Sequence, residues 1–167
     1  RSGGSDGGDG GGGGNGGKGP TGADPLPYVP PTIPTADNHA PIMTDTGTSG
    51  AVTELTTTPG LNYLTSYDVV GFSDVDTSDQ HFITSITPLQ GPKGSLTASI
   101  IFDSTGTGTG GEVFWSYRVL DSEMEYLAAG ETKVEKFQIT MTDAHGGYDS
   151  KTIAITITIT ITITITI

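Results

Sequence analysis

Three aspartates, Asp74, Asp76 and Asp79, fall within six residues, directly after the apolar run at 67–72, and Asp143 lies in a tight turn at 142–148. Carboxylate oxygens are ligands that calcium prefers, and one ion takes about six to eight oxygens. In a loop, Asp74 and Asp76 can both face one ion because they are two residues apart, and Asp79 could return to it. The pattern predicts a calcium site. The alternative is that these aspartates only form turns, since Asp side chains bond to nearby backbone there.

Other kinds of site lack their patterns in this sequence. The segment at 74–76 has no following glycine and no distal glutamate, so it is not an EF-hand loop. The histidines, His39, His81 and His145, show no three- or four-residue spacing with one another, and there is no cysteine, which argues against zinc. The sequence also has no Gly-x-Ser-x-Gly nucleophile elbow. We therefore expect a protein that is not an enzyme.

The charge of the chain restricts its partners. Seven basic and nineteen acidic residues give a formal net charge of -12. Binding to nucleic acid or to an anionic membrane surface needs clustered Lys and Arg, so neither is expected. Cations are the natural partners, although acidity can also serve solubility alone. The absence of cysteine excludes disulfides and thiolate metal sites, and no apolar run is long enough to span a membrane as a helix.

The composition divides the chain into three parts. Residues 1–37 are rich in glycine and then in proline, which predicts a flexible linker with a polyproline II spacer. Residues 38–160 carry the patterns of a folded domain. Residues 161–167 continue a strict Ile-Thr alternation that begins at Ile155. This extension either reaches into a neighbouring module or fibre, or is an artefact beyond the true last strand, and we favour the artefact.

Alternating apolar residues predict a series of strands in the folded domain. We expect strands near 51–55, 67–72, 81–87 and 95–102, the last with Leu96 and Phe102 on one face, followed by strands around 113–119 and 137–141 and a last strand from about 148. Between them, residues 121–129 predict one helical turn that Asp121 could cap. Trp115 and Tyr117 could stack on a sugar if exposed, but their alternating strand favours the core. The whole predicts an all-β fold, an antiparallel β-sandwich with one short helical turn.

Five motifs in this order resemble the VCBS repeat, a cadherin-like and Ig-like module of large bacterial secreted adhesins and surface proteins. The resemblance covers about 38–159. The motifs are Asn-His-Ala-Pro at 38–41, Gly-Phe-Ser-Asp-Val-Asp at 71–76, the Gly/Thr turn at 107–110 before Val-Phe-Trp at 113–115, Tyr-Leu-Ala-Ala-Gly-Glu at 126–131, and Asp-Ala-His-Gly-Gly at 143–147. Two departures are His39, where an aspartate is common, and the Ile-Thr run in place of the usual ending. The first puts a calcium site at the joint, near Asp37 and Asn38, in doubt.

This resemblance implies a function and further ligands. It implies a non-catalytic structural or adhesive repeat at the bacterial cell surface, supported by calcium, with neighbouring repeats and a surface receptor or polysaccharide as partners. Glu54, in the first strand, lies where cadherin-like folds often supply a carboxylate at the domain end, and Asp143 could reach the same pole of the sandwich. Two alternatives remain. One is an accessory, polysaccharide-binding domain of a secreted hydrolase. The other is a fibre subunit assembled by strand addition.

Overall fold

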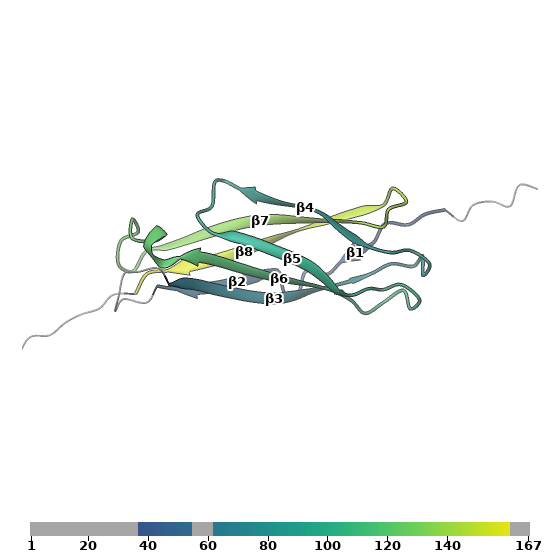
Figure 1. Ribbon diagram of the computed structural model, residues 1–167, viewed down its shortest axis with the longest axis horizontal. Coiled ribbons are helices and arrows are strands. Elements are labelled where there is room, and N and C mark those ends of the chain that lie inside the picture. Colours follow the sequence, from purple (N-terminus) through teal and green to yellow (C-terminus); the bar gives the residue numbers. More distant parts are fainter. Residues whose placement is uncertain (1–36, 55–61, 161–167) are drawn as a thin grey trace, which may run out of the picture. The chain divides into compact units, whose positions relative to one another are not determined.

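The computed structural model describes residues 37–54 and 62–160 (Figure 1). Most of the predicted linker, the end of the first predicted strand and the extension at 161–167 lie outside the described residues. Within the described ranges, no helix is long and apolar enough to cross a membrane. The described elements are β1 (Ile42–Met43), β2 (Ser49–Thr53), β3 (Tyr63–Ser73), β4 (Phe82–Leu89), β5 (Ser95–Phe102), β6 (Gly111–Leu120), the 3-10 turn η1 (Asp121–Glu123), β7 (Thr132–Thr142) and β8 (Tyr148–Thr158).

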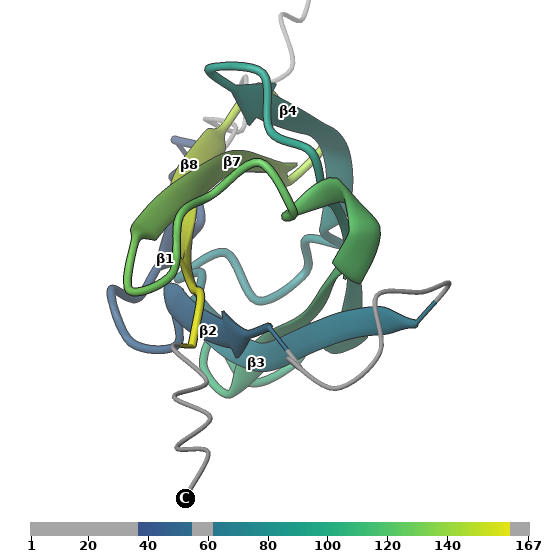
Figure 2. The same cartoon turned by 90° about the vertical axis from the view of Figure 1, so that its left-hand side faces the viewer.

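The strands form two four-stranded sheets, ordered β1-β3-β6-β5 and β2-β8-β7-β4. Figure 2 shows β3 and β7 on opposite sides of the core. The predicted all-β sandwich is therefore confirmed. Its pairs are antiparallel except for β2, which lies parallel to β8. The chain enters one sheet as β1 and crosses to the other as β2, at a turn where Gly47 has a φ of 72°.

The core forms where the alternating faces of the two sheets meet, as in other sandwiches. In β6, β7 and the second half of β8 every second residue is buried, because successive side chains point to opposite faces. Trp115 and Tyr117 are fully buried, so both belong to the core, as their alternation predicted. Their polar atoms have partners: the Trp115 indole N–H donates to the Gly47 carbonyl at 2.7 Å. The buried apolar residues of the four inner strands are Leu64, Val70 and Phe72 of β3, Val113, Trp115, Tyr117 and Val119 of β6, Phe137, Ile139 and Met141 of β7, and Ile153, Ile155 and Ile157 of β8.

Two local predictions are wrong. Phe102 was expected to share the inner face of β5 with Leu96, but its side chain is 63% exposed. The register between β5 and β6 shifts between Ile100 and Phe102, and such a bulge turns the following side chain to the other face. In η1, Leu120 is the N-cap residue and no side chain caps the turn, so Asp121 does not cap it.

Candidate metal centre

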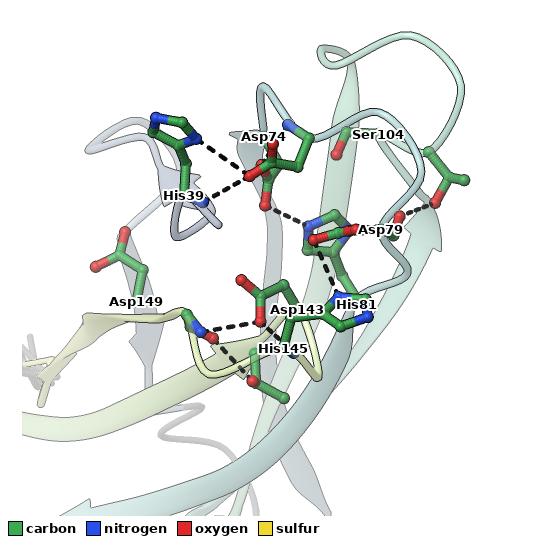
Figure 3. Close-up of polar contacts among 12 residues, drawn as sticks. His39, Asp74, Asp79, His81, Ser104, Asp143, His145 and Asp149 are labelled. Atoms are coloured by element: carbon green, nitrogen blue, oxygen red, sulfur yellow. Dashed lines mark hydrogen bonds and ion pairs between the residues drawn. The ribbon is translucent and has the colours of Figure 1, made fainter. Parts of the chain in front are cut away.

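Two loops at one end of the sandwich place three carboxylates together (Figure 3). Asp74 directly follows β3, Asp79 lies in the same loop before β4, and Asp143 lies in the hairpin between β7 and β8. One oxygen from each of the three lies within 4.8 Å of the others. All three side chains are buried, with exposed fractions of 2%, 4% and 0%. We call Asp74, Asp79 and Asp143 the aspartate cluster.

Asp74 is fixed by its own loop and by a histidine. Its Oδ1 accepts the Asp76 backbone N–H at 2.8 Å, which closes a tight turn. Its Oδ2 lies 3.1 Å from Nε2 of the buried His81, whose Nδ1 lies 2.6 Å from Asp103. Burial alone would lower the pKa of His81, but the bonds to Asp103 and Asp74 outweigh it and raise that pKa. Its two ring nitrogens therefore link Asp74 to Asp103 behind the cluster.

Asp143 is held by donors from two sides. Its Oδ1 accepts the backbone N–H groups of His145 at 2.7 Å and Gly147 at 3.0 Å. Its Oδ2 accepts the Asn38 side-chain amide at 2.8 Å, which ties the N-terminal segment to the hairpin. Burial would raise the pKa of Asp143, but these bonds lower it below its ordinary value. A side chain at position 147 would collide with the Asp143 carboxylate, so a glycine is required there.

Asp79 is the least satisfied member of the cluster. Its Oδ1 accepts the Ser78 hydroxyl at 3.2 Å. Its Oδ2 lies 3.2 Å from His145 Nδ1, but this contact lacks hydrogen-bond geometry, and no described group forms a hydrogen bond to that buried oxygen. A buried carboxylate oxygen without a donor is costly. A cation bound between the three aspartates would satisfy it.

The structure places the other two predicted ligands elsewhere. Asp76 follows Asp74 in the loop, but it is not part of the cluster, and its Oδ2 accepts the His39 backbone N–H at 2.6 Å. Glu54 lies at the opposite end of β8, where its backbone N–H donates to the Thr158 carbonyl. Burial, followed by the negative charges of Glu125 and Asp121, raises the pKa of Glu54. Glu54 and the aspartate cluster therefore belong to two ends of the sandwich.

Sequence reasoning missed three contributions to this end of the molecule. His81, Asp103 and Asn38 each contact a cluster residue or its partner. Asn38 and Asp143, like His81 and Asp103, are far apart in the sequence and meet only in the fold, and no ligand-spacing rule covers the seven positions from Asp74 to His81. All three histidines also contact aspartates of this region: His39 contacts Asp76, His81 contacts Asp74 and Asp103, and His145 contacts Asp79.

A second buried carboxylate, Glu135, lies inside the sandwich on β7 and is 2% exposed. It accepts the backbone N–H groups of Lys93 at 2.7 Å and Gly94 at 3.0 Å, and the Tyr117 hydroxyl at 2.9 Å. Lys133 Nζ lies 3.2 Å away. Burial would raise the pKa of Glu135, but these donors lower it, while burial and the Glu135 charge raise the pKa of Tyr117. Glu135 thus fastens the β4–β5 loop to the core.

Comparison with known proteins gives a weak structural likeness and no family. No protein-family model and no curated protein matches the chain. Among solved structures, the chain is similar to one described as "Structure of the N-terminal domain of PorA", with 11% identity and a TM-score of 0.34. The match covers 74% of this chain and 89% of that chain. A likeness this distant carries no argument about function.

Proposed function

We propose that this chain is a calcium-binding, non-catalytic β-sandwich that serves as a structural or adhesive repeat of a secreted bacterial cell-surface protein. One observation carries the calcium part of this proposal. Three buried carboxylates converge, and one of their oxygens has no hydrogen-bond donor among the described residues. The five motifs that resemble VCBS repeats support the part about the cell surface.

The geometry of the aspartate cluster suits calcium better than zinc. Two oxygens bound to one calcium ion are at most about 5 Å apart, given calcium–oxygen distances of about 2.3–2.6 Å. Separations within 4.8 Å satisfy this limit. Zinc prefers nitrogen and sulfur ligands, whereas the converging ligand atoms here are three carboxylate oxygens. His81 has both ring nitrogens engaged by Asp103 and Asp74, which leaves His145 as the one nearby imidazole among the described residues. Waters and loop carbonyls would complete the shell of a calcium ion.

The proposed role of the ion is mechanical. The aspartate cluster joins the loop after β3 to the β7–β8 hairpin, and Asn38 ties the N-terminal segment to the same hairpin. An ion bound there cross-links these segments and removes the repulsion between carboxylates. In tandem copies, a fixed domain end would stiffen the chain. Glu54, near Asp121 and Glu125 at the other end, stays a prediction for a separate calcium contact.

The test is a calcium titration by calorimetry, together with thermal melts in calcium, magnesium and excess chelator. We expect calcium to stabilise the protein by about 2.7 kcal/mol at a hundredfold excess over its dissociation constant, and magnesium to have little effect. Asp79→Asn should abolish most of the binding. The matched control, Asp68→Asn, removes an exposed carboxylate of β3 and should bind as the unmodified protein does. A calcium-independent melting temperature would refute the proposal.

A further inference from the structure

A cleft of about 330 Å³ lies where β3 begins and β6 ends, at the opposite end of β3 from Asp74. This volume is at the lower end of the range for small-ligand sites. Two of the five Lys and Arg side chains in the described ranges, Lys93 and Arg118, line the cleft. Basic side chains are therefore concentrated here in an otherwise acidic protein. The lining residues are Tyr63, Lys93, Ser95, Arg118, Val119, Leu120 and Glu123.

Arg118 points outward from the middle of its sheet. Its neighbours across the sheet are Thr65 on β3 and Ser95 on β5, whereas Tyr117 and Val119 on either side of it face the core. Its guanidinium carbon lies 5.1 Å from the centre of the Tyr63 ring. Within residues 37–54 and 62–160, no acceptor forms a hydrogen bond or ion pair with this guanidinium. Its planar fork of N–H donors is free to hold a carboxylate.

Lys93 provides a second cation from a segment that is already fixed. The backbone N–H groups of Lys93 and Gly94 both donate to the buried Glu135. A side chain at position 94 would collide with the Tyr117 ring, so the loop can approach this closely only because residue 94 is glycine. The Lys93 ammonium lies 3.7 Å from Glu123, which is half exposed. A cleft whose walls are held in place before binding loses less entropy when a ligand enters.

The sheet surface beside the cleft carries exposed aromatic rings. Tyr63 is 53% and Tyr67 71% exposed. The Tyr67 ring lies 6.0 Å from the Phe114 ring, centre to centre. Cross-strand pairing places Ser116 opposite Tyr67, and Thr97 opposite Ser116, on the same face. Such a surface offers apolar rings that can stack on the C–H face of a sugar, with hydroxyls beside them that can bond to sugar hydroxyls.

We infer that this cleft binds a glycan that ends in a carboxylated sugar. The Arg118 guanidinium holds the carboxylate in its fork, Lys93 adds a second positive charge, and the Tyr63 ring packs on the sugar. The cleft has two cations and one anion, Glu123, so its net charge is matched by a single carboxylate. A polyanionic chain is disfavoured because the formal charge of the whole protein is -12. This inference does not rest on the calcium proposal.

The test is saturation-transfer NMR with 3′-sialyllactose, methyl glucuronide and the neutral sugar lactose, performed with chelator so that calcium plays no part. We expect the carboxylated sugars to bind with dissociation constants in the millimolar range, and lactose not to bind. The two acidic probes distinguish a sialate from a hexuronate as the preferred end group. Arg118→Gln should weaken binding by about tenfold or more, which is ~1.4 kcal/mol. The matched control, Lys136→Gln, removes an exposed cation of the other sheet and should leave binding unchanged.

Four results would overturn the inference. The first is no saturation transfer to either acidic sugar. The second is equal binding of lactose, which would make the carboxylate irrelevant. The third is displacement of the sugar by acetate as effective as by free sialic acid, which would reduce the cleft to a simple anion site. The fourth is tighter binding of an oligogalacturonate than of 3′-sialyllactose, which would exclude a site for one terminal carboxylate. Melts of Arg118→Gln should match those of the unmodified protein, since this exposed side chain packs on no core residue.

Discussion

Glu135 and the aspartate cluster are both buried carboxylates of one sandwich, but their surroundings differ. Glu135 accepts three hydrogen bonds and lies beside the Lys133 ammonium. The cluster holds three carboxylates, and Asp79 Oδ2 has no donor among the described residues. The first arrangement is complete without a ligand. The second gathers three carboxylates, whose negative charge a bound cation could balance.

The difference shows what each group does for the protein. Taking an ionised carboxylate out of water is strongly unfavourable unless donors or cations replace the water. At Glu135 the protein supplies those donors, so the side chain is a structural fastening. At the aspartate cluster the protein supplies them to Asp143 but not fully to Asp79. The proposed ion would supply at the aspartate cluster what hydrogen-bond donors supply at Glu135.

The largest loss of stability should come from removing Glu135, the carboxylate whose hydrogen bonds are complete without a ligand. Glu135→Ala would leave two backbone N–H groups and the Tyr117 hydroxyl without their acceptor, and Lys133 without its partner. We expect a loss of about 3–5 kcal/mol in the free energy of unfolding, as for other broken buried pairs. Urea unfolding measures it. The control is Glu123→Ala, which removes a surface partner of Lys93 and should cost less than about 1 kcal/mol. Equal effects of the two changes would mean that Glu135 matters no more to the fold than a surface carboxylate.

Much of this fold follows from local patterns in the sequence. The strands β6 and β7 could be predicted because period-two alternation depends only on which face is buried, and Trp115, Phe137 and Ile139 all lie in the core. Glu135 carried a signal that was missed. It is in phase with Phe137 and Ile139, so the alternation that placed those residues in the core also placed Glu135 there. An acidic residue at an inward-facing position of a strand predicts a buried carboxylate with hydrogen-bond partners.

The site was less predictable because it depends on long-range contacts and on local irregularities. Asp74 and Asp79 could be grouped from their spacing, but only the packing of the sheets brings Asp143 to them. Asp76 shares their loop, yet its carboxylate is engaged by His39. Glu54 was predicted as a ligand because cadherin-like folds often have a carboxylate at that position. The length of β8 separates it from the cluster. The sequence pattern gives the type of ligand, and the fold decides which ligands meet.

Without calcium, a substitution in the aspartate cluster should raise the free energy of unfolding, whereas one at Glu135 should lower it. The expected rise is smaller than the loss from Glu135→Ala. In chelator, Asp79→Asn removes one of three converging charges and leaves an amide that can donate a hydrogen bond, so we expect a gain in stability of about 1 kcal/mol. Glu135→Gln should instead destabilise the protein, because the amide loses acceptor capacity and the charge that pairs with Lys133. Urea midpoints in chelator measure both. If Asp79→Asn also destabilises the protein without calcium, the cluster is already satisfied and needs no ion.

The smallest expected effect is on the pH dependence of stability. The pKa of Glu135 is lowered from 4.5 in the folded state, so its ionised form stabilises the fold at pH values above 4.5. This contribution is lost as the pH falls through the folded-state pKa, because protonation then removes the charge that the donors stabilise. We expect the stability difference between the unmodified protein and Glu135→Gln to be constant near neutral pH and to shrink below 4.5. Urea midpoints across this range, measured in chelator, test it. A stability difference that stays constant into strong acid would mean that Glu135 acts through its shape and hydrogen bonds rather than through its charge. The contrast with the aspartate cluster would then rest on packing and not on how the charge is balanced.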